Sequence, residues 1–309
     1  MWLAETAVDV ASLEALAKEG IRFTILAPHQ AKGVRRRGES SYRDVSGGQV
    51  DTSMPYDVVL PSGRRIAVFF YDGQTSRAVA CEHLLNQGDK LAERLLRGFR
   101  NGQDRAQLVH IATDGETYGH HHKYGEMALA FALRTIERTD GVRLTNYGEF
   151  LAQYPPTHEV EICERTAWSC AHGIERWASD CGCNSGGSPG WHQRWRTPLR
   201  TALDLLRDRL APLYEQATAT LLSDPWRARD AYIDVTIDGR PEVRERFLRN
   251  QAKRPLTPDE TARVFQLLEM QRHLLLMYTS CGWFFDDISG VEPLQNLLYA
   301  ARAIQLAQT

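Results

Sequence analysis

Long apolar runs are missing from this sequence. No stretch approaches the roughly 18 consecutive apolar residues that a membrane-spanning helix requires. Residues 1–5 open the chain without the basic region and apolar stretch of a signal peptide. We therefore expect a cytoplasmic protein that neither crosses nor binds a membrane.

An excess of basic charge is also missing. The chain has 37 Lys and Arg residues against 39 Asp and Glu residues, a formal net charge of -2. Proteins that bind nucleic acids usually carry a basic stripe. The one basic run, Lys32 to Arg37, contains no aromatic residue and is typical of a solvated loop. We expect no nucleic-acid partner.

Cysteine is sparse for a chain of this length. Six cysteines in 309 residues do not make a disulfide scaffold. Thiols in a reducing cytoplasm are the simpler interpretation.

Apolar segments alternate with helical patterns through the first half of the chain. A polar, Gly-rich stretch at 30–53 reads as a long loop, and Pro61-Ser62-Gly63 as the turn of a hairpin. Strands that are apolar on both faces and alternate with helices predict a parallel sheet or barrel. Strands are expected at residues 1–4, 23–27, 58–60, 66–71, 108–112 and 142–145, and helices at 10–17, 76–99 and 124–137.

The amino-acid composition changes after Tyr154-Pro155-Pro156. A stretch rich in Cys, Trp and Gly at 163–195 is followed by long helical patterns. One helix is expected to open at Thr197-Pro198. Another opens at Thr257, which is followed by Pro at the first helical position and Glu at the third, a strong start signal. We expect two domains, residues 1–156 and residues 157–309.

An acidic and histidine-rich decapeptide, residues 113–122, directly follows the apolar segment 108–112. It contains Asp114, Glu116 and three consecutive histidines. Loops at the carboxyl ends of strands build the active sites of barrels and open α/β sheets. An Asp-Gly pair alone would indicate only a turn, but the whole decapeptide indicates a site.

Glu5 occupies the equivalent place after the first expected strand. Taken alone, it is typical of a solvated charge at a helix start. Two carboxyl groups at the ends of different strands of one sheet can instead face each other across a pocket, as glycoside cleavage requires.

Residues 2–5 and 113–119 resemble two signature motifs of glycoside hydrolase family 57. In that family the first motif carries the nucleophilic Glu and the second the acid/base Asp, which implies these roles for Glu5 and Asp114. Residues 279–285 are similar to the family's last motif, whose Trp lines the substrate site. This implies a substrate contact for Trp283, although Gly282 stands where many members have Asp.

The resemblance also implies a fold. The triple histidine, residues 168–173 and residues 181–183 resemble a branch of the family in which a helical domain follows the barrel. The expected fold is α/β: the C-terminal part of a (β/α)7 incomplete TIM-like barrel, followed by a mostly helical domain that contributes to the substrate site. In the family the nucleophile lies on the fourth strand, after two earlier motifs. Neither occurs here, so we expect an N-terminally incomplete barrel with exposed strand edges.

The function that follows from the resemblance is a retaining glycosidase or transglycosylase acting on α-glucan-like oligosaccharides or polysaccharides. Glu5 is the expected nucleophile and Asp114 the acid/base, with the pKa of Asp114 raised by Glu5 and by partial burial. No cofactor or metal is expected, and the sequence does not indicate an oligomeric state. The expected substrate-binding residues are Trp2, Glu116, His120, His121, His122, Trp191 and Trp283.

Two alternatives remain open. Asp114 and the histidines could hold zinc in a carbohydrate deacetylase, although adjacent histidines on a strand point to opposite faces. The missing motifs would also suit a non-catalytic glycan-binding protein. A second group of residues could also hold zinc, although their spacings are tighter than those of usual structural zinc sites. The alternative is that they are buried thiols in a Gly-rich loop. The group consists of Cys170, His172, Cys181 and Cys183.

Overall fold

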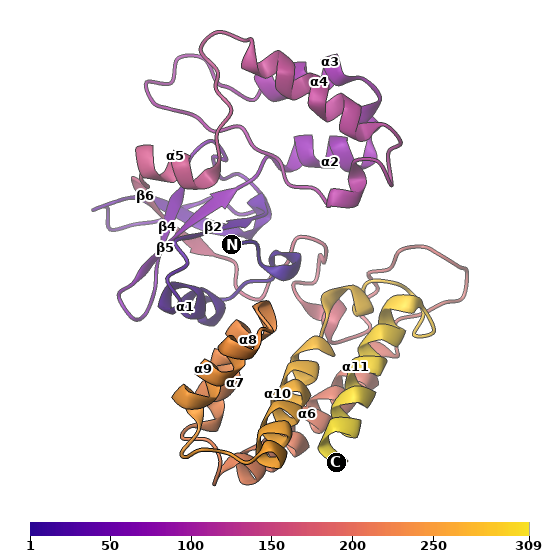
Figure 1. Cartoon of the computed structure of the whole chain (residues 1–309). Helices are drawn as coiled ribbons and strands as arrows, with labels where there is room; N and C mark the ends of the chain where they lie inside the picture. The colour runs from indigo at the N-terminus through magenta and orange to yellow at the C-terminus, as the bar shows by residue number, and fades with distance from the viewer. Residues whose placement is uncertain (309) are drawn as a thin grey trace. The chain divides into compact units, whose positions relative to one another are not determined.

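The computed structural model describes residues 1–308. The chain divides into two compact units, Met1–Ile174 and a second that begins at Glu175 (Figure 1). Each unit has its own hydrophobic core. The observed division lies further along the chain than the expected one at residue 156, because strand β6 (His158–Ile162) pairs with strands of the first unit.

The first unit is built on a six-stranded sheet with the strand order β1-β5-β4-β6-β2-β3. The pairs β1–β5 and β4–β6 are parallel and the other three pairs are antiparallel. The sheet is therefore mixed rather than purely parallel, in part because the expected hairpin joins β4 to β5. The remaining strands are β1 (Phe23–Leu26), β2 (Ala31–Arg36), β3 (Arg43–Asp44), β4 (Tyr56–Val59) and β5 (Arg65–Phe70).

Several expected elements are wrong in detail. The strands expected at residues 1–4, 108–112 and 142–145 do not form among the described residues. The segment 108–112 makes only scattered backbone bonds, such as that from Asp72 N to the carbonyl of His110 at 2.9 Å. The stretch at 30–53, expected as a loop, contains β2 and β3. Its polar composition hid the strands because β2 and β3 expose several charged side chains.

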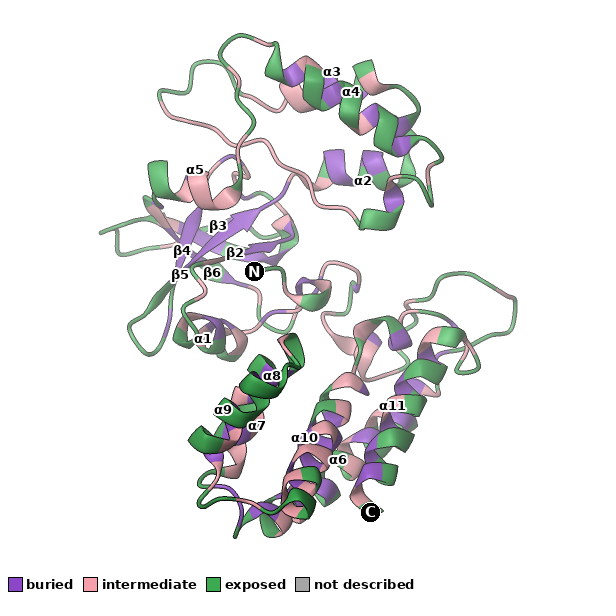
Figure 2. Cartoon of the chain, in the orientation of Figure 1, coloured by how far each residue is buried: buried purple, intermediate pink, exposed green. Residues whose placement is uncertain are grey.

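Helix α1 (Val10–Lys18) covers one face of the sheet and α5 (Tyr147–Gln153) the other (Figure 1). Asp9 caps α1 as expected, accepting a hydrogen bond of 2.7 Å from Ser12 N. The side chains of β5 alternate between the two faces of the sheet. Phe70 packs in the core beneath α1, and Phe69 packs against Phe150 of α5. The buried residues accordingly concentrate on the central strands (Figure 2).

A second layer of helices in the first unit consists of α2 (Gly73–Cys81), α3 (Gly88–Leu96) and α4 (Gly125–Glu137). The single helix expected at 76–99 is interrupted at His83, whose φ of 57° is left-handed and cannot continue a helix. Gly88 opens α3 where a Cβ would lie 2.9 Å from the ring of Phe131 on α4. The break thus lets α3 and α4 pack closely.

The second unit is helical, as the sequence predicts. Helix α10 begins at Thr257 with the expected reciprocal bonds between Thr257 and Glu260. None of the helices among residues 1–308 is both long and apolar enough to cross a membrane. The helices are α6 (Arg196–Thr218), α7 (Pro225–Ala231), α8 (Ile233–Ile237), α9 (Pro241–Gln251), α10 (Pro258–Leu276) and α11 (Val291–Gln308).

Candidate active site

Glu5 lies on a short 3-10 turn, Ala4–Thr6, that precedes α1. Its carboxylate Oε2 accepts hydrogen bonds from Trp168 Nε1 at 3.0 Å and from Ser169 Oγ at 2.8 Å. The backbone N of Trp168 also donates to the carbonyl of Glu5 at 3.1 Å. These contacts, from residues far away in the sequence, fix the direction of the carboxylate.

The backbone at Glu5 is strained. Glu5 and Thr6 both have left-handed φ values, 57° and 48°, which cost non-glycine residues about 1–3 kcal/mol each. The buried amide of Gln30 holds this conformation. Its Oε1 accepts from Thr6 Oγ1 at 2.9 Å and from Ala27 N at 2.8 Å, while its Nε2 donates to the carbonyl of Thr6 at 2.9 Å. Non-glycine strain of this kind is concentrated at functional sites.

Asp114 follows the segment 108–112 and precedes a 3-10 turn, Gly115–Thr117. Partial burial of its carboxyl group is the largest cause of a raised pKa. The negative charges of Glu116 and Glu5 raise the pKa of Asp114 further, and His121 opposes them. The two carboxylates expected from the sequence are therefore close enough to influence each other.

A cavity of about 520 Å³ adjoins Asp114. Aromatic side chains form much of its lining, and the indoles of Trp2 and Trp168 meet edge to face with their centroids 5.0 Å apart. Aromatic faces suit the apolar faces of sugar rings. The lining residues are Trp2, Ile25, Ile111, Ala112, Thr113, Asp114, Gly115, Tyr118, Tyr147 and Trp168.

His110 fixes one wall of this cavity from behind. Burial lowers its pKa to about 4, so the ring is neutral at pH 7. Its Nε2 lies 3.1 Å from the carbonyl of Thr52 and therefore carries the proton. Its Nδ1, 2.9 Å from Tyr147 Oη, then accepts from the tyrosine hydroxyl. Burial raises the pKa of Tyr147 to about 12, so this hydroxyl keeps its proton.

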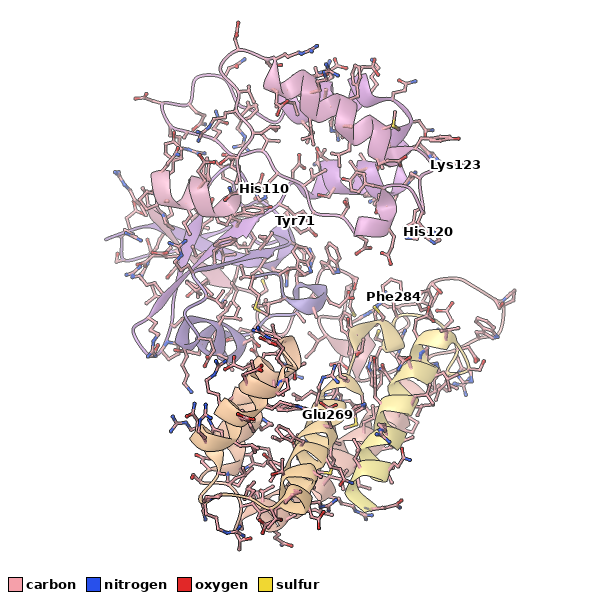
Figure 3. The ribbon with its side chains drawn as sticks, in the orientation of Figure 1. Tyr71, His110, His120, Lys123, Glu269 and Phe284 are labelled. Carbon is pink, nitrogen blue, oxygen red and sulfur yellow. The ribbon has the colours of Figure 1, made fainter. Side chains whose placement is uncertain are left out.

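The expected histidines lie in the loop before α4. His120 and His121 are exposed, with ring centroids 5.0 Å apart. His122 is tied to the carbonyl of Ala80 on α2 at 2.9 Å. His120 lies well away from His110 in the view of Figure 3. Of the three, only His121 acts on the pKa of Asp114, through its charge.

Two of the expected substrate-binding residues belong to the second unit. Trp191 is half exposed. Trp283 has only 1% of its surface exposed and stacks on Trp195, with the centroids 6.1 Å apart. A ring so deeply packed has no face open to a sugar. This result corrects the expectation for Trp283, because its apolar neighbours on α6, α10 and α11 enclose it.

The deacetylase alternative is not supported by a metal site. Among residues 1–308, Asp114 and the three histidines form no group of side chains that could share one ion. The group that does meet this criterion lies elsewhere, at Cys170, and is considered below.

Sequence reasoning missed several residues of the site. The sequence marks Trp168 and Ser169 only as features of a family branch, although both donate hydrogen bonds to Glu5. Nothing in their spacing from Glu5 could have indicated this contact. His110 offered a signal, because it is the one polar residue in the otherwise apolar run 108–112.

Two solved structures are similar to this chain. One is an exo-type maltose-forming amylase from Pyrococcus sp. ST04, with a TM-score of 0.72 and 15% identity over 99% of this chain. The other is the alpha-amylase AmyC from Thermotoga maritima, with a TM-score of 0.59 and 13% identity, also over 99% of this chain. The chain spans 55% and 58% of their lengths. These likenesses confirm the expected α/β fold of TIM-like barrel type followed by a helical part.

None of the curated proteins matches the chain. A domain of unknown function, DUF3536, matches residues 191–309. The model of glycosyl hydrolase family 57 matches residues 1–163, more than half of the chain. This match includes both Glu5 and Asp114, and the chain belongs to glycosyl hydrolase family 57.

Proposed function

We propose that this protein is a retaining glycoside hydrolase or transglycosylase acting on α-glucans, with Glu5 as nucleophile and Asp114 as acid/base. The observation that carries the proposal is the difference between the two carboxyl environments. Glu5 accepts two hydrogen bonds, whereas burial and two neighbouring negative charges raise the pKa of Asp114. Catalytic acid and base pairs are characterised by environments that separate their pKa values.

In the first step, Glu5 Oε attacks the anomeric carbon while Asp114 gives its proton to the departing glycosidic oxygen. In the second step, the Asp114 carboxylate takes a proton from water or from an acceptor hydroxyl. The oxygen so activated attacks the anomeric carbon and releases Glu5 as a carboxylate. Both groups return to their starting protonation states, and the anomeric configuration is retained.

The substrate class is supported by the family and by the cavity. The similar structures are both amylases by name, although identities near 15% carry only the fold. The tryptophans and tyrosines beside Asp114 offer stacking surfaces for glucose rings. Glu116 and His121 lie within electrostatic reach of Asp114 and tune its proton affinity.

The test is turnover of a panel of α-glucans by the 309-residue protein and by its Glu5→Gln and Asp114→Asn variants. Glu19→Gln is the matched control, because it makes the same chemical change at an exposed position at the end of α1. Each active-site substitution should reduce kcat by a factor of about 10³ or more, whereas the control should be unaffected.

Azide separates the two roles. On an aryl α-glucoside, whose leaving group departs without protonation, this small nucleophile needs neither a general acid nor a general base. It should restore turnover to Asp114→Ala with retention and to Glu5→Ala, whose shortened side chain leaves room for azide, with inversion. Turnover that neither substitution changes would contradict the assignment. Oligosaccharide binding in the cavity, without turnover on any glucan, would instead favour a glycan-binding protein.

A further inference from the structure

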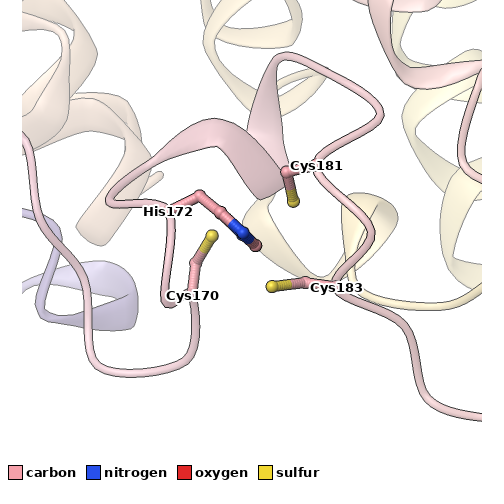
Figure 4. A group of neighbouring side chains, drawn as sticks. All are labelled: Cys170, His172, Cys181 and Cys183. Carbon is pink, nitrogen blue, oxygen red and sulfur yellow. The ribbon is translucent and has the colours of Figure 1, made fainter.

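Four metal-binding side chains converge in the segment 170–183, which follows directly on Ser169. They are Cys170, His172, Cys181 and Cys183. One ligand atom from each residue, Sγ or an imidazole nitrogen, lies within 4.8 Å of all the others. Figure 4 shows the three sulfur atoms and the imidazole directed toward a common centre.

These separations suit a tetrahedral zinc ion. Bond lengths of about 2.3 Å to sulfur and about 2.0 Å to nitrogen place the ligand atoms of such a site roughly 3.5–3.8 Å apart. The ligand atoms lie up to 4.8 Å apart here, about 1 Å more than in such a site. Rotation of the side chains can bring the ligand atoms closer by this amount. Three thiolates and one imidazole are a donor set typical of structural zinc sites.

Glycines explain how such short spacings can form a site. Gly182, between two of the cysteines, has a φ of +82°. Gly173, directly after His172, has a φ of +79°, and a Cβ there would lie 2.4 Å from the carbonyl oxygen of Arg165. Both positions require glycine, since left-handed backbone strains other residues. Each ligand pair therefore lies at a tight turn.

A buried cation lies against the cluster. Arg196 is fully buried, and its Nη1 donates to the carbonyl of Cys183 at 3.0 Å and contacts Cys181 Sγ at 3.9 Å. It forms no ion pair with a carboxylate anywhere in the part of the chain that the structure describes. The negative charge of the buried Asp286 and the positive charge of Arg176 also act on Arg196, although Asp286 forms no ion pair with it. Buried charges normally have a compensating partner.

We propose that Cys170, His172, Cys181 and Cys183 hold a structural zinc ion, with Arg196 as its counter-charge. Zinc bound by three thiolates and a neutral imidazole carries one net negative charge, which Arg196 balances. On binding, the three thiols lose their protons to solvent. Four protein ligands complete the tetrahedral shell and leave no position for a substrate, so the ion stabilises the fold of the segment and takes no part in glycoside cleavage.

The first measurement is the metal content of the purified 309-residue protein by plasma mass spectrometry. We expect about one zinc per chain, as for a closed four-ligand site. Exchange of the zinc for cobalt should give thiolate charge-transfer bands and the intense visible bands of tetrahedral Co²⁺. This measurement on the unsubstituted protein does not depend on any variant folding.

Variants then locate the ion. Cys181→Ser and Cys183→Ser should reduce zinc retention against a chelator by about tenfold or more. Cys81→Ser is the matched control, an exposed cysteine on α2 outside the cluster, and should keep its zinc. Arg196→Met should weaken zinc retention by about tenfold, while Arg196→Lys, which keeps the charge, should weaken it less.

The outcomes are distinct. Zinc near one equivalent, with a tetrahedral cobalt spectrum and loss only in the cluster variants, supports the proposal. Protein purified with no metal that binds neither zinc nor cobalt would overturn it, as would iron in place of zinc. Equal zinc retention in Cys81→Ser and Cys181→Ser would also overturn it. None of these results depends on glycosidase activity, so the proposal stands or falls separately from the proposed function.

Discussion

The strained backbone at Glu5 and Thr6 should depend on the side-chain amide of Gln30. Substituting Gln30 by Met keeps an unbranched side chain of similar size but removes its amide. Three groups would lose their close partner on Gln30: the N–H of Ala27, the carbonyl of Thr6 and the Thr6 hydroxyl. Two longer bonds of 3.2 Å, from Gln30 Nε2 to the carbonyl and the hydroxyl of Thr166, would be lost as well. Each buried polar group left without a partner costs about 1–3 kcal/mol. The expected loss of unfolding free energy is therefore about 3–9 kcal/mol.

Urea denaturation followed by tryptophan fluorescence measures this loss, with an unchanged slope indicating that only stability has changed. Gln49→Met is the matched control, because Gln49 is exposed and no hydrogen bond of its side chain is recorded in the structure. Its expected effect is within about 0.5 kcal/mol. A loss below about 1 kcal/mol for Gln30→Met would refute the view that the amide holds the strained turn.

Three further predictions concern charge. Folding raises the pKa of Asp114, so the ionised Asp114 carboxylate opposes folding at neutral pH. Asp114→Asn should therefore leave the melting temperature unchanged or higher even though activity is lost, and a lower melting temperature would contradict this. Glu116→Gln removes a negative charge that raises the pKa of Asp114. The basic limb of the pH profile of kcat/KM should therefore move to lower pH, and an unmoved limb would show that Asp114 is not the acid. Hydrogen bonds from Arg65 and Arg35 lower the pKa of Glu159. The contribution of Glu159 to stability is therefore complete above about pH 4.3 and is lost as pH falls through the lowered pKa. The urea midpoint of Glu159→Gln should approach that of the unsubstituted protein in acid, and a gap that stays constant with pH would contradict the pairing.

Local signals were readable from the sequence. The Asp9 cap, the capping box at Thr257 and the hairpin turn at residues 61–63 all depend on contacts within a few residues, and each is found. The family motifs indicated Glu5 and Asp114 as the catalytic pair, and those roles stay a prediction.

What the sequence did not indicate depends on distant contacts. The bonds from Trp168 and Ser169 to Glu5 join residues more than 160 positions apart. The burial of Trp283 follows from the packing of three helices, and a Trp near a motif looks the same whether it binds sugar or fills a core. The spacing of the four residues in the cysteine cluster does not reveal the left-handed turn at Gly182.

The central claim is that Glu5 forms a covalent bond to the sugar. Incubation with a 5-fluoro-α-glucosyl fluoride, which enters the first step faster than the second, should accumulate the glycosyl-enzyme. Mass spectrometry of the digested protein should then find one added glycosyl group on the peptide that contains Glu5, and none in the Glu5→Gln variant. A label on another residue, or an unlabelled protein that still turns over α-glucans, would contradict the account.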